Sequence, residues 1–171
     1  WVSTIRDTID KISAGSIEGV GFAMPGPFDY EKGIPLFTGS NKKYENMYGM
    51  DVPWALRTHL NLPPHFPVRF INDATAFAIG EEWLGNTKGY SRSLYITLGT
   101  GFGSAFLSEG LPVVKGDHVP EMGCLYHLPF SESRADDYFS TRGLTERYHK
   151  LSGNRVQGAY EIAVAKDDDE V

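Results

Sequence analysis

The organisation of this chain follows from residues 68–82, which read VRFINDATAFAIGEE. Residues 68–71 are mostly β-branched or aromatic and follow a proline, a pattern typical of a short buried strand. From Ala74 onward, small and apolar residues favour a helix that runs to Gly85. Asn72 and Asp73 therefore lie where a strand ends and a helix begins, which in an open α/β sheet is where ligands bind.

Asp73 has two interpretations at this junction. As a helix N-cap, it would accept hydrogen bonds from backbone N–H groups. As a catalytic carboxylate, it would face a ligand beyond the strand ends. A cap needs only one of the two polar residues, so the presence of both Asn72 and Asp73 is the reason to expect a ligand. The residues themselves leave both interpretations open.

Composition and charge exclude several classes of protein. With 171 residues, of which 41% are hydrophobic, the chain can bury one sizeable core or two smaller ones. The net charge of −6 and the lack of a basic stripe argue against nucleic acid and anionic membranes as partners. No apolar run approaches the ~18 residues of a membrane-spanning helix. Cys124 is the only cysteine, which points to a reducing compartment, and we expect a cytoplasmic protein.

Strand and helix patterns alternate along the chain. Apolar residues at three- and four-residue steps from Val2 to Ile12 predict an amphipathic helix that ends at Gly15, and Asp51 is positioned to cap a helix that ends near Leu60. The polar linker at 86–91 predicts a domain boundary, so we expect one α/β domain over residues 1–88 and another over 89–171. The remaining expected elements are strands at 17–23, 34–37, 93–98, 104–108 and 125–128, and helices beginning at 135, 141 and 159.

The segment Gly99-Thr100-Gly101-Phe102-Gly103 is a glycine-rich turn between two of these strands. It is neither a dinucleotide fingerprint, because a strand and not a helix follows it, nor a Walker A loop, because it lacks Gly-Lys-Ser/Thr. A plain β-hairpin turn would also use glycines, for positive φ angles. Three glycines around a threonine exceed what a hairpin requires, and their N–H groups together with the Thr100 hydroxyl could hold a phosphate.

Four motifs, taken together and in order, resemble those of the ROK family of bacterial sugar kinases, repressors and open-reading-frame proteins. The motifs are Pro25-Gly26-Pro27-Phe28-Asp29, Asn72-Asp73-Ala74, Leu98 to Gly103, and Pro120-Glu121-Met122-Gly123. The resemblance covers essentially the whole chain, through Ser140-Thr141-Arg142-Gly143-Leu144. It implies an actin-like ATPase fold, which is ribonuclease H-like, with two α/β domains around a cleft.

The resemblance also implies an activity, the ATP-dependent phosphorylation of a sugar hydroxyl. In that picture Asp73 is the catalytic base and Asn72 is a sugar ligand. Glu121 resembles the glutamate of the family's G-E-x-G-H sugar motif, and Asp136 lies where relatives carry a second sugar-binding glutamate. The cofactors would be ATP and Mg²⁺, and we expect a homodimer whose small-molecule partner is a sugar. The second phosphate-binding loop would consist of Gly99, Thr100, Gly101 and Gly103.

The chain departs from the family pattern at several points. Cys124 stands where the G-E-x-G-H motif has histidine, and one cysteine cannot build the family's zinc loop, so we expect no structural zinc and assign no metal ligand. Asp136 is shorter than the usual glutamate by one methylene. The first phosphate loop would precede Trp1 and the adenosine-binding region would follow Val171. We therefore expect a piece of a longer protein that does not phosphorylate sugar by itself.

Two other functional classes stay open. A sugar-sensing ROK regulator is the first, although a sensor could dispense with the Asp73 carboxylate and no helix-turn-helix is visible in the sequence. The second is a glycoside hydrolase that uses Asp73 and Glu121 as its paired carboxylates. A hydrolase leaves the glycine-rich turn unexplained, and the sugar kinase is the interpretation that accounts for all the motifs.

Overall fold

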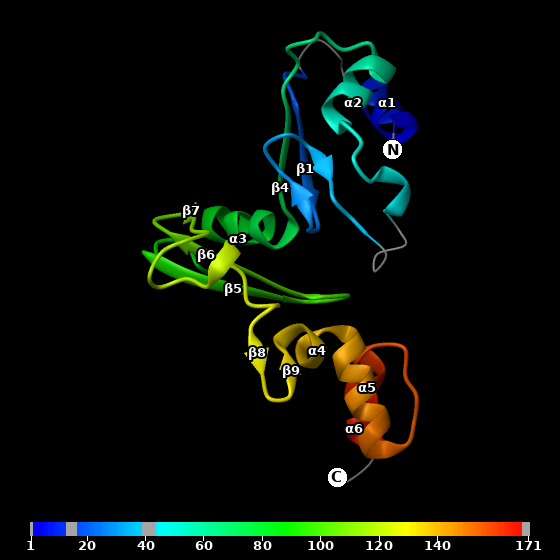
Figure 1. The fold of residues 1–171 in the computed structure, drawn as a ribbon, viewed down its shortest axis with the longest axis vertical. Helices are drawn as coiled ribbons and strands as arrows, with labels where there is room; N and C mark the ends of the chain where they lie inside the picture. The colour runs from blue at the N-terminus through cyan, green and yellow to red at the C-terminus, as the bar shows by residue number, and fades with distance from the viewer. Residues whose placement is uncertain (1, 13–16, 39–43, 169–171) are drawn as a thin grey trace. The chain divides into compact units, whose positions relative to one another are not determined.

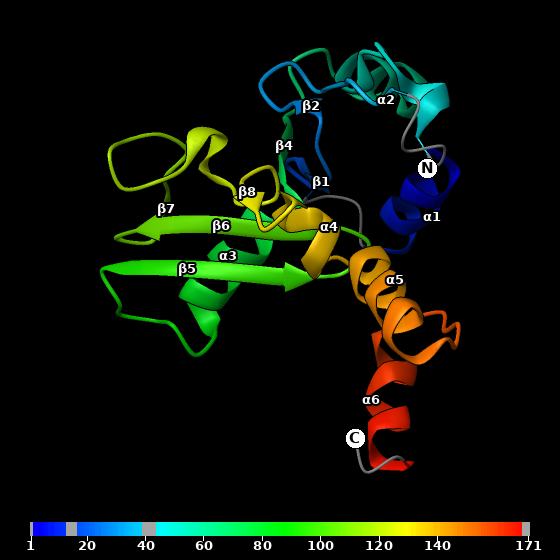
Figure 2. The same ribbon diagram turned by 60° about the horizontal axis from the view of Figure 1, so that its bottom comes forward.

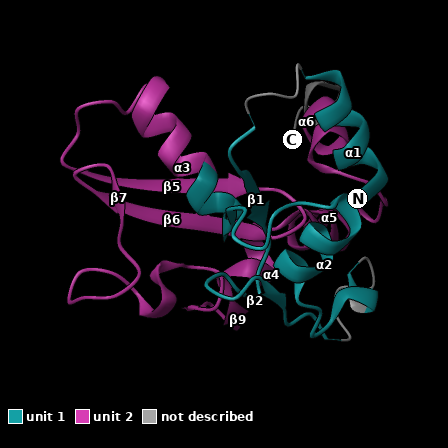
Figure 3. Ribbon diagram, turned by 90° about the horizontal axis from the view of Figure 1, so that it is seen from above, with its two compact units in different colours: residues 1–76 teal, residues 77–171 magenta. Residues whose placement is uncertain are grey.

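The structure is a computed structural model that describes residues 2–12, 17–38 and 44–168. The chain divides into two compact units, Trp1–Ala76 and Phe77–Val171 (Figure 3). The division falls within helix α3 (Asp73–Leu84), which begins in unit 1 and continues into unit 2. The boundary predicted between residues 88 and 89 stays a prediction, because a compact unit of this chain need not coincide with a complete domain.

Unit 1 contains a pair of parallel strands, β1 (Val20–Met24) and β4 (Val68–Asn72), which lie side by side in Figure 1. Their register pairs Met24 with Asn72, so both strands end at the same edge. The connection between them contains helix α2 (Val52–Leu60), as parallel strands require a long crossover. Helix α1 (Val2–Lys11) confirms the amphipathic helix expected from the sequence, while its expected end at Gly15 lies outside the described residues.

The core of unit 1 forms around α2 and β4. Four buried residues form it, namely Val52, Leu56, Phe66 and Val68. The expected N-cap of α2 is confirmed, since the Asp51 carboxylate accepts a hydrogen bond from the Trp54 N–H at 2.9 Å. The helix ends at Asn61, whose positive φ of 53° is a common helix terminator.

A small hairpin follows the carboxyl end of β1. It consists of β2 (Phe28–Asp29) and β3 (Ile34–Pro35), which pair antiparallel, and it packs with Met24, Phe28 and Phe37 in a second core. Gly33 closes this hairpin with a φ of +73°, and a Cβ there would lie 2.5 Å from the Phe70 ring. Only glycine fits at this position, both for its φ and for its space. A short 3₁₀ helix, η1 (Glu45–Met47), precedes α2.

Unit 2 is built on an antiparallel sheet of strands β5 (Arg92–Leu98), β6 (Phe102–Ser108) and β7 (Leu111–Pro112). Ala78 of α3 is fully buried against Tyr95, Ala105 and Leu107 of this sheet, and Figure 2 shows the helix alongside the β5–β6 pair. Because Ala78 has a small side chain, the helix can approach the sheet closely.

The last part of unit 2 is mainly helical. The prediction of a strand at residues 125–128 is wrong. These residues form a turn, in which the Leu128 N–H donates to the Leu125 carbonyl at 3.0 Å. The two short strands that follow this turn, at residues 129–130 and 133–134, pair with each other as a hairpin. The elements here are η2 (Glu121–Gly123), β8 (Pro129–Phe130), β9 (Ser133–Arg134), α4 (Ala135–Phe139), α5 (Thr141–Ser152) and α6 (Ala159–Asp168). No helix in the described ranges is long and apolar enough to cross a membrane.

Candidate active site

Asn72 is the residue that caps helix α3. Its side-chain Oδ1 accepts a hydrogen bond from the Thr75 N–H at 3.1 Å and lies 3.3 Å from the Thr75 hydroxyl, which also donates to it. An acceptor on the residue before the helix, bonded to the third helical N–H, is the usual N-cap geometry. This contact argues against Asp73 as the N-cap of α3, because its neighbour Asn72 occupies the capping position.

Asp73 is the first residue of α3 and is exposed. Its Oδ1 accepts hydrogen bonds from the Ala74 N–H at 3.0 Å and from the Asn72 side-chain amide at 3.1 Å. Within the described part of the chain, its Oδ2 has no hydrogen-bond partner. The helix dipole favours a negative charge at this position. Asp73 thus presents one exposed carboxylate oxygen beyond the end of β4, where a ligand can reach it.

Tyr30 supports this pair from the hairpin that follows β1. Its hydroxyl accepts a hydrogen bond from the Asn72 Nδ2 at 3.3 Å and donates to the Met24 carbonyl at 3.1 Å. The strand register explains the contact, since Met24 is paired with Asn72 at the same edge. Sequence reasoning missed Tyr30, and no spacing signal could have found it. Its hydroxyl orients the Asn72 amide, which in turn contacts the Asp73 carboxylate.

The glycine-rich turn connects β5 and β6 in unit 2. Leu98 pairs with Phe102 at the end of the ladder, and the Gly99 N–H donates to the Gly101 carbonyl at 3.1 Å. The segment is therefore a hairpin turn, the plainer of the two forms considered from the sequence. Thr100 is exposed at its tip. Phosphate binding by this turn stays a prediction.

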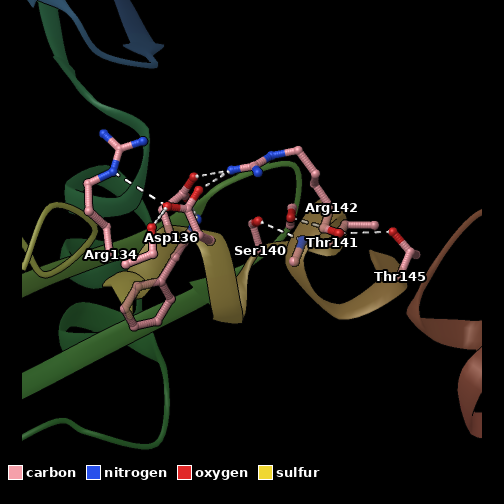
Figure 4. A network of polar contacts seen from close by, with 11 residues as sticks. Arg134, Asp136, Ser140, Thr141, Arg142 and Thr145 are labelled. Atoms are coloured by element: carbon pink, nitrogen blue, oxygen red, sulfur yellow. Dashed lines mark hydrogen bonds and ion pairs between the residues drawn. The ribbon is translucent and has the colours of Figure 1, made fainter. Parts of the chain in front are cut away.

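Asp136 of α4 and Thr141 of α5 hold the glycine-rich turn by hydrogen bonds to Phe102 and Gly99. The Phe102 N–H donates to the Asp136 Oδ1 at 2.7 Å. The Thr141 N–H and hydroxyl both donate to the Gly99 carbonyl, each at 2.8 Å. Figure 4 shows Asp136 and Thr141 on either side of Ser140, which is fully buried. The structure therefore brings the predicted sugar ligand Asp136 together with the predicted phosphate loop.

A charged cluster surrounds Asp137, next to Asp136. The Asp137 carboxylate accepts hydrogen bonds from the Ser133 hydroxyl at 2.5 Å and from the Arg142 guanidinium at 2.8 Å, and Arg134 lies 3.6 Å away. The Ser133 bond first, and the Arg142 bond second, lower the pKa of Asp137 well below its ordinary value. Arg142 also reaches the Asp136 Oδ2 at 3.3 Å. One arginine thus pairs with both aspartates.

Glu121 is exposed at the start of η2. It takes no part in the hydrogen bonds described around Asp136. The turn around it is tight, because Gly123 has a φ of +64° and a Cβ there would lie 2.6 Å from the Val113 carbonyl oxygen. Cys124, at the position of the family histidine, lies 3.8 Å from the His127 Nδ1. Burial raises the pKa of the Cys124 thiol. In the described ranges, no group of three or more His, Cys, Asp or Glu side chains could hold a metal.

The comparison with known proteins identifies the family. The chain matches the sequence model of the ROK family over residues 1–169. It belongs to the ROK family. A curated relative named putative fructokinase, from Bacillus subtilis (strain 168), is 34% identical over 126 residues, which cover 72% of this chain and 40% of the relative. The chain thus spans about two fifths of that relative's length.

Two solved structures from the ROK family show the fold. A glucokinase from Streptomyces griseus, solved in complex with glucose and AMPPNP, matches with a TM-score of 0.62 and 22% identity, covering 89% of this chain and 50% of that one. A transcriptional regulator, described as a homolog of the E. coli MLC protein, matches with a TM-score of 0.73 and 16% identity, covering 98% and 45%. The expected α/β, actin-like ATPase fold is confirmed. The family includes both kinases and regulators.

Proposed function

We propose that the full-length protein transfers the γ-phosphoryl group of ATP to a hydroxyl of a neutral sugar, with Asp73 as the general base. The observation that carries this proposal is that Asn72, and not Asp73, caps the helix at the end of β4. Asn72 caps α3 through Thr75, so the exposed Asp73 carboxylate is not needed for the cap. A carboxylate oxygen left open at a helix N-terminus, beyond parallel strands, suits a ligand hydroxyl.

Asp73 would orient the sugar hydroxyl and accept its proton. As the hydroxyl oxygen bonds to the γ-phosphorus, the bond between that phosphorus and the β,γ-bridging oxygen breaks, and ADP leaves with the electron pair. Phosphoryl transfer depends mainly on positioning and on stabilising charge, so a weakly basic carboxylate is adequate. Among the predicted sugar ligands, Glu121 is exposed and Asn72 has its amide held by Tyr30 and Asp73.

The glycine-rich turn would contribute to binding the phosphates. The Thr100 hydroxyl and the backbone N–H groups of the turn are the donors that such a group requires. Mg²⁺ would screen the triphosphate mainly through phosphate oxygens and water. The absence of structural zinc and the homodimer stay predictions.

The comparisons support a kinase without deciding it. The putative fructokinase from B. subtilis is named for a sugar kinase activity, and the glucokinase from S. griseus was solved with glucose and an ATP analogue. The second candidate is a sugar-sensing regulator, which the match to the MLC homolog favours. A regulator has no need of an exposed carboxylate at the position of Asp73, and we therefore give precedence to the kinase.

A coupled assay tests the proposal. Full-length wild-type protein is assayed with ATP and Mg²⁺ against a panel of hexoses and N-acetylhexosamines, beside Asp73→Ala and the control Asp7→Ala, an exposed carboxylate on α1. Loss of a positioned general base costs ~10²–10⁴ in rate. We expect that loss for Asp73→Ala and none for the control. Equal turnover by Asp73→Ala and wild type contradicts the role of Asp73. Sugar binding by the wild type without any turnover identifies the regulator.

A further inference from the structure

The carboxylate of Asp136 is directed at the protein's own backbone. Its Oδ1 accepts a hydrogen bond from the Phe102 N–H at 2.7 Å, a length typical of charge-assisted bonds. Its Oδ2 lies 3.3 Å from the Arg142 guanidinium. A sugar hydroxyl would have to compete with the Phe102 amide for one oxygen and with Arg142 for the other.

The glycine-rich turn is held on its other side by Thr141. Both hydrogen bonds from Thr141 go to the Gly99 carbonyl at 2.8 Å, so the turn is held at Gly99 by α5 and at Phe102 by Asp136 of α4. The junction between α4 and α5 is itself closely packed. Ser140 is fully buried and caps α5 by accepting from the Gly143 N–H at 3.2 Å. A Cβ on Gly143 would lie 2.3 Å from the Asp137 carbonyl oxygen, so α4 and α5 are in contact at a point where a side chain does not fit.

These bonds leave the middle of the turn free for a ligand. The Phe102 N–H is bonded to Asp136 and the Gly99 N–H to the Gly101 carbonyl. Across the described residues, the N–H groups of Thr100 and Gly101 have no hydrogen-bond partner, and both residues are exposed. Neighbouring unpaired N–H groups in a turn are the arrangement that binds an anion.

We propose that Asp136 is a positioning residue, which holds the Phe102 end of the glycine-rich turn so that the Thr100 and Gly101 amides are available to nucleotide phosphates, and that it is not a sugar ligand. The proposal rests on the proposed function, in which this turn binds phosphate. It replaces the role that the family resemblance implied for Asp136. Thr141 performs the matching task at Gly99.

The test compares Asp136→Ala with the matched control Asp137→Ala in the full-length protein. Asp137 is the adjacent carboxylate and shares Arg142, but its described bonds go to Ser133, Arg134 and Arg142 and not to the turn. Three quantities are measured: the Kd for AMPPNP with Mg²⁺, the Kd for D-glucose, and the amide hydrogen exchange of residues 99–102.

We expect Asp136→Ala to weaken AMPPNP binding by roughly 10- to 100-fold, the range for loss of a hydrogen bond to a charged group. Its glucose affinity should stay within about 2-fold of wild type, and exchange at 99–102 should accelerate. Asp137→Ala should leave all three unchanged. Thr141→Val should weaken AMPPNP binding by roughly 2- to 10-fold, whereas Thr141→Ser, which keeps the hydroxyl, should restore it.

Three outcomes overturn the positioning role. The first is loss of glucose binding in Asp136→Ala with AMPPNP binding intact, which would make Asp136 a sugar ligand. An equal loss of AMPPNP binding in Asp136→Ala and Asp137→Ala is the second, because it would indicate general damage to α4. The third is unchanged exchange at 99–102 in Asp136→Ala. If wild type itself binds no AMPPNP, the proposed function fails, and the exchange measurement alone decides whether Asp136 holds the turn.

Discussion

Replacing Asn72 or Asp73 by alanine should separate stability from activity at two adjacent positions. We expect Asn72→Ala to destabilise the protein clearly, and Asp73→Ala to abolish turnover while changing stability little. The physical reason lies in their contacts. Asn72 caps α3 through Thr75 and also donates to the Tyr30 hydroxyl, whereas Asp73 is exposed and, among the residues that the structure describes, bonds only to its two neighbours in sequence.

The magnitudes follow from these bonds. Loss of an N-cap costs about 1 kcal/mol, and loss of the bond to Tyr30 costs about 1 kcal/mol more, so Asn72→Ala should lower the free energy of unfolding by about 2 kcal/mol. For Asp73→Ala, the lost interaction with the helix dipole is worth about 0.3–1 kcal/mol. The higher helix propensity of alanine offsets part of that cost by about 0.5 kcal/mol. The net change for Asp73→Ala should therefore be within about 0.5 kcal/mol of zero.

Urea denaturation of the full-length variants measures this difference, provided that the slopes of the transitions agree with wild type. Asn72→Asp is an informative companion, since it keeps an oxygen for the cap but loses the donor to Tyr30 and places a like charge beside Asp73. It should fall between wild type and Asn72→Ala. If Asp73→Ala proved as destabilising as Asn72→Ala, Asp73 would share the cap and the argument for a free carboxylate would fail.

Three further predictions concern single positions. Gly33→Ala should lower the free energy of unfolding by about 2 kcal/mol or more. The φ of Gly33 is +73°, and the Cβ of an alanine there would lie 2.5 Å from Phe70. A decrease of less than about 0.5 kcal/mol in urea denaturation contradicts this prediction. Because the Ser133 hydroxyl lowers the pKa of Asp137, the stabilisation from Asp137 is complete above pH ~4 and is lost as the pH falls below it. In an NMR titration, Ser133→Ala should raise the midpoint of Asp137, and an unmoved midpoint refutes the assignment. Tyr30→Phe should keep the fold yet reduce turnover several-fold, and a rate equal to wild type would show that the Tyr30 hydroxyl does not orient the site.

Local sequence patterns determined most of the secondary structure and the family. The strand–helix junction at Asn72-Asp73, the cap at Asp51 and the two strands that flank the glycine-rich turn were all predicted, because each depends on residues within a few positions of one another. The prediction failed at residues 125–128, where the sequence Leu-Tyr-His-Leu forms a turn and the strand begins at Pro129. A run of four residues is too short for its periodicity to distinguish a strand from a turn.

Only the tertiary structure decided what the polar side chains of the candidate site do. Asn72 meets Tyr30 across 42 residues of sequence, Phe102 meets Asp136 across 34, and Thr141 meets Gly99 across 42. Strand register creates the first contact, and the packing of α4 and α5 against the end of the β5–β6 hairpin creates the other two. No spacing in the sequence encodes such pairings, because they arise when separate elements pack together and buried polar groups must find partners.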